Sequence, residues 1–289
     1  MRILLTGSSG FIGREVLTKL RTEHKVFEYD VLNGDDILDI SNLERNVRLY
    51  QIDLIFHIAA EANLYSMENI SGAKKGMDIN VVGTNNVALV CATHKIKLIY
   101  ASTICVYGDT TELKDETHCL PEPQELYAYT KLAGEQIVKG CHKNFTLDYI
   151  ILRFATVYGP RMREALGCYI FIKQALAGEE VTVHGDGTQE RTLTHVEDIA
   201  DGCMNAVKYF DTAKNRTYNI STDEKITATQ MAKDIIAITN STSKIKYIPQ
   251  RQNQTFSENV SYTLAEQYLH WKPKYTWQNG VTLTIQHFK

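Results

Sequence analysis

A tyrosine and a lysine four residues apart, Tyr127 and Lys131, could perform acid/base chemistry. Residues four apart lie on one face of a helix, so the phenol and the ammonium would be neighbours. Because a nearby cation favours the charged form of a phenol, we expect the pKa of Tyr127 to lie below its usual value of about 10. Such a tyrosine would serve as a general acid and base near neutral pH.

The same spacing also occurs in Tyr169–Lys173 and Tyr268–Lys272, so the motif alone is weak. Only the pair at Tyr127 falls in the predicted helix that follows the apolar run Lys97–Ala101. For the other two pairs, lysine stems packed along a helix surface are the better interpretation. Position therefore singles out the first pair.

Two hydroxyl residues, Ser102 and Thr103, continue the apolar run Lys97–Ala101. In open sheets of parallel strands, ligands bind at the carboxyl ends of the strands. We therefore expect both hydroxyls to lie at the same edge of the sheet as the acid/base pair.

Short apolar runs alternate with helical periodicity through the first half of the chain, which is typical of a parallel sheet with crossover helices. The predicted strands are Arg2–Thr6, Lys25–Tyr29, Leu54–Ile58, Lys97–Ala101 and Asp148–Phe154. The helices expected between them are Phe11–Leu20, Asn42–Leu49, Asn80–His94 and a segment through Tyr127–Lys139. The pattern predicts an α/β fold with a Rossmann-type doubly wound parallel sheet.

The chain has 289 residues, which allows about two domains. The regular alternation fades after Tyr158–Pro160, and shorter elements follow. We expect a Rossmann domain over residues 1–158 with a return segment of about 190–210. A smaller mixed α/β substrate domain is expected over 159–189 and 211–289.

The composition is that of an ordinary globular protein, with 44% hydrophobic and 22% charged residues. A net charge of −3 without long runs of one sign argues against nucleic acid as a partner. No apolar stretch suits a membrane span or a signal peptide, so no membrane partner and a cytoplasmic location are expected. The six cysteines are scattered, which predicts free thiols, and neither they nor the histidines form a metal motif.

Three glycines, Gly7, Gly10 and Gly13, directly follow the first predicted strand. The first allows a tight turn, the second lets backbone amides approach a pyrophosphate, and the third lets the helix pack close to the sheet. The helix would direct its unpaired N–H groups and positive dipole end at the phosphates. Asp30 ends the next strand, where a carboxylate can accept ribose hydroxyls and would repel a 2′-phosphate. The pattern therefore favours NAD over NADP.

Together and in order, these motifs resemble the extended short-chain dehydrogenase/reductases, and within them the NAD-dependent nucleotide-sugar epimerase/dehydratase family that includes UDP-glucose 4-epimerases. The resemblance covers nearly the whole chain. Besides the motifs above, the matching segments are 36–37, 57–60, 80–84, 102–108, 152–160, 185–191, 196–198 and 218–220.

The resemblance implies that Tyr127 is the acid/base, that Lys131 binds the nicotinamide ribose, and that Thr103 hydrogen-bonds the reacting sugar hydroxyl. The implied cofactor contacts are Gly7, Ser9, Gly10, Phe11, Ile12, Gly13, Asp30, Asp36, Ile37, Ala59, Ala60, Asn80, Ser102, Tyr127 and Lys131. The implied substrate contacts are Thr103, Cys105, Arg191 and Arg251. Surface ion pairs are the alternative for the two arginines, and a homodimer is implied by the family alone.

The branch of the family is indicated by the residues after Thr103. Dehydratases of this type carry Thr-Asp-Glu here, and decarboxylases carry a glutamate in the last place, whereas this chain has Ile104 and Cys105. Without carboxylates at these positions, dehydration and decarboxylation are disfavoured. A 4-epimerase needs only the tyrosine, lysine and hydroxyl trio, so inversion at the sugar C4 through a 4-keto intermediate is the function expected from the resemblance.

Three alternatives remain open. Cys105 matches the cysteine that acts as acid/base in GDP-sugar 3,5-epimerases, although the position of its usual basic partner is occupied by Ala165. A 4-dehydrogenase or reductase that exchanges NAD at each turnover is the second alternative. The third is a non-catalytic NAD-binding sensor, against which the intact trio argues.

Overall fold

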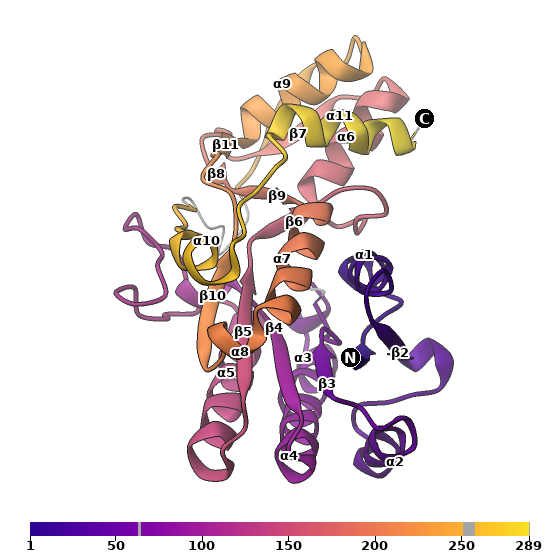
Figure 1. The fold of residues 1–289 in the computed structure, drawn as a ribbon. Coiled ribbons are helices and arrows are strands. Elements are labelled where there is room, and N and C mark those ends of the chain that lie inside the picture. The colour runs from indigo at the N-terminus through magenta and orange to yellow at the C-terminus, as the bar shows by residue number, and fades with distance from the viewer. Residues whose placement is uncertain (63–64, 251–257, 289) are drawn as a thin grey trace.

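The computed structural model describes residues 1–62, 65–250 and 258–288. Its centre is a six-stranded parallel sheet with the strand order β10-β5-β4-β3-β1-β2 (Figure 1). The strands are β1 Arg2–Thr6, β2 Lys25–Tyr29, β3 Leu54–His57, β4 Lys97–Thr103, β5 Tyr149–Phe154 and β10 Arg216–Ile220. The predicted α/β, Rossmann-type fold is therefore confirmed.

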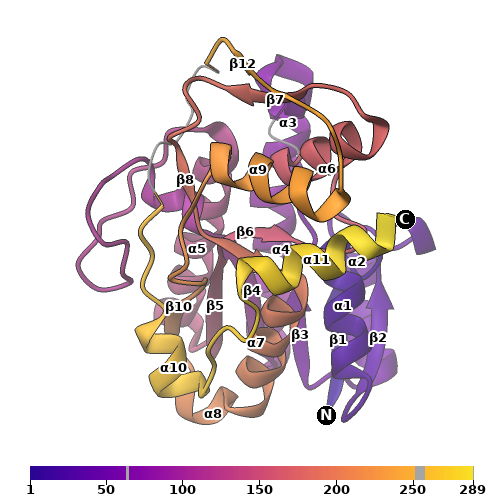
Figure 2. The same ribbon diagram turned by 90° about the horizontal axis from the view of Figure 1, so that it is seen from above.

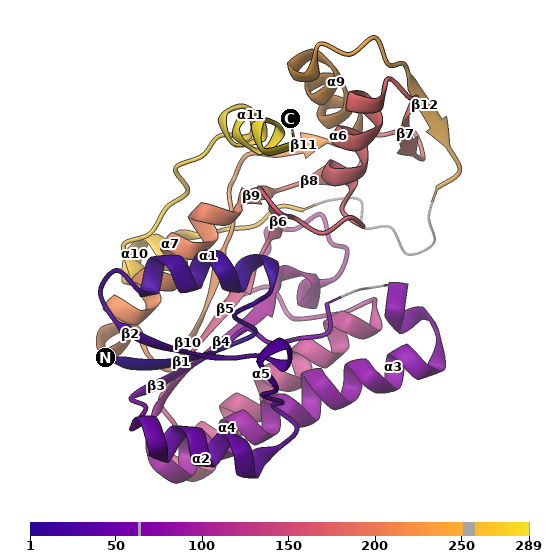
Figure 3. The same cartoon turned by 90° about the vertical axis from the view of Figure 1, so that its right-hand side faces the viewer.

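Helices cover both faces of the sheet because side chains on its strands alternate between two apolar cores. Ile3 and Leu5 pack with the helices of one face, and Leu4 packs with those of the other. Figure 3 shows these two layers, with the sheet between them. One layer holds α1 Phe11–Leu20, α7 Val196–Lys208 and α10 Thr263–Leu269, and the other holds α2 Ile40–Tyr50, α3 Ile70–Met77, α4 Thr84–His94 and α5 Leu126–Phe145.

The predicted bounds of β1, β2 and α1 agree with the structure, whereas other segments differ from expectation. Helix α4 is preceded by α3 and by a π-helical segment, η3 Asp78–Gly83, so the helical region begins earlier than residue 80. The sixth strand, β10, pairs with β5 through Arg216 and Ile150 to Ile220 and Phe154. The expected division placed this segment in the substrate domain. The chain returns to the sheet edge through α7 and α8 Phe210–Ala213.

A second region lies beyond the carboxyl ends of the strands (Figure 1). Its helices, α6, α9 and α11, surround a separate apolar core and lie near one another in Figure 2. Short strand pairs, separate from the six-stranded sheet, accompany these helices. The elements are β6 Thr156–Tyr158 with β9 Leu193–His195, β7 Val181–His184 with β12 Ile245–Ile248, β8 Glu190–Arg191 with β11 Ile226–Thr227, and helices α6 Gly167–Ala177, α9 Ala228–Thr239 and α11 Trp277–Phe288.

Helix α5 is 20 residues long and contains Tyr127 and Lys131 near its start. Short 3₁₀ turns come after β2, β3 and β4. They are η1 Val31–Asn33, η2 Tyr65–Glu68 and η4 Ile104–Tyr107. Within the described residues, no helix combines the length and the apolar character that crossing a membrane requires.

Candidate active site

The acid/base pair lies in the first turns of α5. Lys131 is 3% exposed, and its Nζ lies 4.5 Å from the centroid of the Tyr100 ring on β4. The glycine at Gly134 makes room for this ring, because a Cβ there would lie 2.3 Å from the Tyr100 hydroxyl. The helix and the strand therefore pack closely enough to hold the lysine side chain over the aromatic face.

Burial lowers the pKa of the Lys131 ammonium from its ordinary value of 10.5 to about 7, and only the Glu135 carboxylate opposes the change. The same ammonium lies near the buried His57 ring. Burial, with a smaller contribution from Lys131, lowers the pKa of His57 to about 3, so this histidine is neutral. Lys131 therefore titrates in the range where acid/base enzymes work.

The expected effect of Lys131 on Tyr127 is wrong for the chain by itself. Burial raises the pKa of the Tyr127 phenol, and the Cys105 thiol raises it further. The group that opposes this shift is Arg163, not Lys131. The phenol therefore holds its proton at neutral pH until a ligand changes its surroundings.

The two predicted hydroxyls end β4, as expected, but only one has a buried charged partner. Ser102 donates a 2.6 Å hydrogen bond to Glu135 of α5. Glu135 is fully buried and receives two hydrogen bonds from Arg153, of 2.8 and 2.7 Å. Thr103 is 7% exposed, and its Oγ1 accepts a hydrogen bond from the Cys105 amide at 3.2 Å. The pair Glu135–Arg153 thus holds β4, α5 and β5 together beneath the site.

Asn80 lies in η3 and is 1% exposed. Its side chain accepts a hydrogen bond from the Glu61 amide and donates to the Glu61 carbonyl, at 2.8 and 2.9 Å. It also donates to Thr130 Oγ1 at 2.9 Å, and Thr130 donates to the Tyr127 carbonyl at 2.7 Å. Asn80 thereby connects the segment after β3 to the turn of α5 that carries the acid/base pair.

The glycine loop after β1 is shaped for close approach. Gly7 has φ +72°, and a Cβ on Gly13 would lie 2.0 Å from the Gly7 carbonyl oxygen. No side chain caps α1 at Gly10, which leaves the first amides of the helix, at Phe11, Ile12 and Gly13, for another acceptor. These features fit a bound pyrophosphate.

The acidic residue at the end of β2 supports this loop. Asp30 is 8% exposed and accepts hydrogen bonds from the Ser9 and Leu32 amides, both at 3.0 Å. Asp36 is exposed, whereas Ile37 is 5% exposed and packs against Gly83.

Two alanines follow β3 beside the glycine loop. Ala59 and Ala60 are half-buried, and the Ala59 amide donates to Thr6 Oγ1 at 3.2 Å. A Cβ on Gly7 would lie 2.7 Å from the same amide nitrogen. The segment after β3 and the glycine loop therefore lie in direct contact at the expected cofactor site.

Of the two predicted substrate arginines, Arg191 lies in β8, and Arg251 lies outside the described residues. The Arg191 Nε lies 3.5 Å from Oε1 of Glu258, a buried carboxylate. Thr192 donates to the other oxygen of Glu258 through its amide and its hydroxyl, at 3.0 and 3.2 Å. Arg191, the residue predicted to bind the diphosphate, is therefore held by a buried carboxylate.

A pocket opens beside Cys105, and it contains charged residues that sequence reasoning missed. Its walls include Lys114, Glu125 and Glu258, besides Cys105. The sequence disfavoured reactions that need carboxylates here, because Ile104 and Cys105 follow Thr103. The fold supplies two from other segments, one just before Tyr127 and one from the segment before α10. Only the place of Glu125 two residues before Tyr127 was a usable signal.

Comparison with known proteins agrees with this geometry. Residues 3–221 match the model of the NAD dependent epimerase/dehydratase family. The chain belongs to this family.

Solved and curated relatives match over nearly the full length. The Thermotoga maritima UDP-glucose 4-epimerase, solved with UDP-glucose, is 28% identical, with a TM-score of 0.92 and coverage of 100% of this chain and 98% of the other. The Bacillus cereus UDP-glucuronic acid 4-epimerase, solved with UDP-glucuronic acid and NAD, is 25% identical, with a TM-score of 0.92 and coverage of 99% and 98%. Human dTDP-D-glucose 4,6-dehydratase is 26% identical over 100% of this chain and 90% of its own. The family therefore spans several reactions on sugar nucleotides.

Proposed function

We propose that this protein is an NAD-dependent nucleotide-sugar 4-epimerase that inverts C4 through a 4-keto intermediate. The observation that carries the proposal is the buried Lys131, which lies in the first turns of α5 together with Tyr127. Thr103 ends the neighbouring strand β4. This trio supplies proton transfer and orientation, the protein's share of a C4 inversion.

Each member of the trio has a separate task. Tyr127 takes the proton of the C4 hydroxyl and later returns a proton to the C4 oxygen. Thr103 holds that oxygen by a hydrogen bond. Lys131 supplies a positive charge that favours the phenolate once ligands fill the space between the two side chains.

NAD bound beside the trio would accept a hydride from C4 and give it back on the other face. The glycine loop, with the first amides of α1, would hold the pyrophosphate, and Asp30 would accept the ribose hydroxyls. Tyr127 and Lys131 would lie on the nicotinamide side. Return of the hydride requires the keto sugar to turn, so the sugar site must allow rotation about the diphosphate linkage.

The test is turnover of matched sugar nucleotides by the purified chain with NAD. UDP-, dTDP-, GDP- and CDP-linked glucose are supplied, and the appearance of the galactose epimer is followed by proton NMR. We expect one nucleotide to support inversion without net change of absorbance at 340 nm, and Tyr127→Phe to abolish it. Net NADH formation would indicate a dehydrogenase instead, and unchanged activity of Tyr127→Phe would contradict the catalytic assignment.

One observation favours a second candidate, a 3,5-epimerase that uses Cys105. Cys105 is exposed, lines the pocket together with Ala128 and lies near the Tyr127 phenol, so a sugar bound there would meet both side chains. Turnover in D₂O separates the two candidates. Deuterium at C3 or C5 of the product supports the thiol chemistry, and its absence supports inversion at C4 alone.

A homodimer is part of the same proposal. Tyr129 and Leu126 on α5 are 54% and 38% exposed, and Val82 just before α4 is 48% exposed. Such apolar side chains on neighbouring helices would be covered by the same surface of a second copy. Sedimentation equilibrium is expected to give twice the chain mass, and Tyr129→Asp is expected to lower it.

A further inference from the structure

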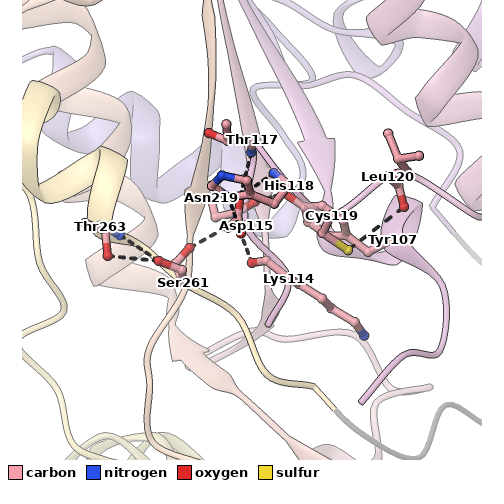
Figure 4. A network of polar contacts seen from close by, with 10 residues as sticks. All are labelled: Tyr107, Lys114, Asp115, Thr117, His118, Cys119, Leu120, Asn219, Ser261 and Thr263. Carbon is pink, nitrogen blue, oxygen red and sulfur yellow. Dashed lines mark hydrogen bonds and ion pairs between the residues drawn. The ribbon is translucent and has the colours of Figure 1, made fainter. Parts of the chain in front are cut away.

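The pocket beside Cys105 has an unusual wall, a lysine that is 1% exposed. The backbone of Lys114 is held on both sides: its amide donates to the Asn259 carbonyl at 2.7 Å, and its carbonyl accepts from the Ser261 amide at 3.1 Å. The Asn219 side chain bonds the Lys114 and Ser261 carbonyls, at 3.2 and 3.0 Å. Figure 4 shows the bonds of Asn219 and the Lys114 side chain extending away from Asn219. These hydrogen bonds fix the backbone of Lys114, from which the ammonium extends.

The same backbone pairing brings the ammonium to a carboxylate. Glu258 directly precedes Asn259, is 6% exposed, and acts electrostatically on the Lys114 ammonium, as does Asp109. Burial lowers the pKa of Lys114, whereas Glu258 raises it. A second carboxylate, Glu125, lines the same pocket at the start of α5.

The pocket lies beside the reacting centre. Cys105 lines it and lies close enough to the Tyr127 phenol to raise the pKa of that phenol. Ala128, the residue after Tyr127, lines it as well. A sugar with its C4 oxygen at Tyr127 would therefore place a neighbouring ring substituent in this pocket.

The described wall of the pocket holds more carboxylates than cations. Of the described lining residues other than Cys105, the ionisable ones are one lysine and two glutamates. The Arg191 Nε lies 3.5 Å from Glu258. A neutral hydroxyl can donate to the carboxylates and accept from the ammonium, which donates, whereas a substrate carboxylate would enter beside two negative charges.

We propose that Lys114, Glu125 and Glu258 form a sugar subsite of net negative charge that selects nucleotide sugars with an uncharged ring over nucleotide uronates. This rests on the proposed function and adds the class of sugar to it. The two solved relatives described above, with UDP-glucose and UDP-glucuronic acid, represent the two classes between which this subsite would choose.

The test compares a hexose with its C6-oxidised form on one nucleotide. The probes are UDP-glucose and UDP-glucuronic acid, or the corresponding pair on whichever nucleotide supports inversion in the preceding assay. We expect the NAD-loaded enzyme to prefer the hexose by about 100-fold in kcat/KM, because like charges next to one another disfavour the uronate. A preference for the uronate, or no preference, would overturn the subsite while leaving the epimerase proposal standing. Failure with every sugar nucleotide would instead contradict the epimerase proposal.

Variants of the pocket residues test whether the pocket causes the preference for the hexose. Glu125→Gln removes one negative charge, and we expect the preference to narrow about tenfold, mainly through faster turnover of the uronate. Glu122→Gln is the matched control, since Glu122 is an exposed glutamate of the same loop and does not line the pocket. Lys114→Met is expected to widen the preference, and its melting temperature shows whether the buried site still folds. Equal effects of Glu125→Gln on both sugars, or an equal shift with Glu122→Gln, would contradict the assignment.

Discussion

Asn80 Nδ2 donates a hydrogen bond of 2.9 Å to Thr130 Oγ1, although the two residues are 50 positions apart in the chain. Both side chains are 1% exposed. Asn80 also bonds Glu61, so these bonds connect the segment after β3, where the cofactor is expected, to the helix that carries Tyr127 and Lys131. The bond is thus a positional link between the cofactor side and the acid/base side of the site.

Thr130→Val removes this link. We expect a loss of about 1–3 kcal/mol in the free energy of unfolding, because the Asn80 amide is left without its buried partner. Epimerase activity should fall as well, since Tyr127 loses its anchor. Thr130→Ser keeps the hydroxyl and is the matched control. Chemical denaturation of both variants measures the difference, and equal stability of the two would contradict the role of this bond.

The buried pair Arg153–Glu135 gives a second prediction. Arg153→Met should destabilise the fold by about 3–5 kcal/mol, because Glu135 would be left as an uncompensated buried charge. The double variant Arg153→Met with Glu135→Leu should recover most of that loss. Denaturation of the two single variants and the double variant forms the cycle, and additive losses would show that the charges do not act as a pair.

The close approach of Gly13 to the Gly7 carbonyl predicts a sharp steric effect. Gly13→Ala would place a Cβ at 2.0 Å from that oxygen, so we expect a loss of about 1–3 kcal/mol and weaker NAD binding. Gly140→Ala is the control, because Gly140 lies inside α5 with no atom within 4 Å of the added Cβ. That variant should gain about 0.5–1 kcal/mol from the lower entropy of its unfolded chain. Melting temperatures and NAD titration measure both, and unimpaired NAD binding by Gly13→Ala would contradict the assignment of the loop.

Glu116 predicts a pH dependence of stability. Burial raises the pKa of its carboxyl from 4.5 to about 7, and its Oε1 accepts a 2.6 Å hydrogen bond from the Asn219 amide. Between about pH 4.5 and 7 the folded chain then holds a proton that the unfolded chain has released, so this group makes stability fall as pH rises. Glu116→Gln keeps an acceptor for Asn219 and should flatten that part of the melting-temperature profile. An identical profile for the variant would show that Glu116 does not titrate in this range.

The sequence by itself determined the features that depend on neighbouring residues. The bounds of α1, the turn at Gly7 and the pairing of Tyr127 with Lys131 on one helix all follow from periodicity and turn chemistry over a few residues. The order of the motifs along the chain was enough to identify the family.

Only the tertiary structure decided what surrounds these motifs. Glu258 meets Cys105 and Lys114 because the segment before α10 pairs with residue 114, a contact between positions far apart in the chain that leaves no local pattern. The addition of β10 to the sheet edge depends in the same way on its register with β5. The pKa of Tyr127 also depends on burial by the whole site, and for that reason the spacing to Lys131 predicted its direction wrongly. Local chemistry thus identified the reacting groups, while their charges and neighbours came from long-range packing.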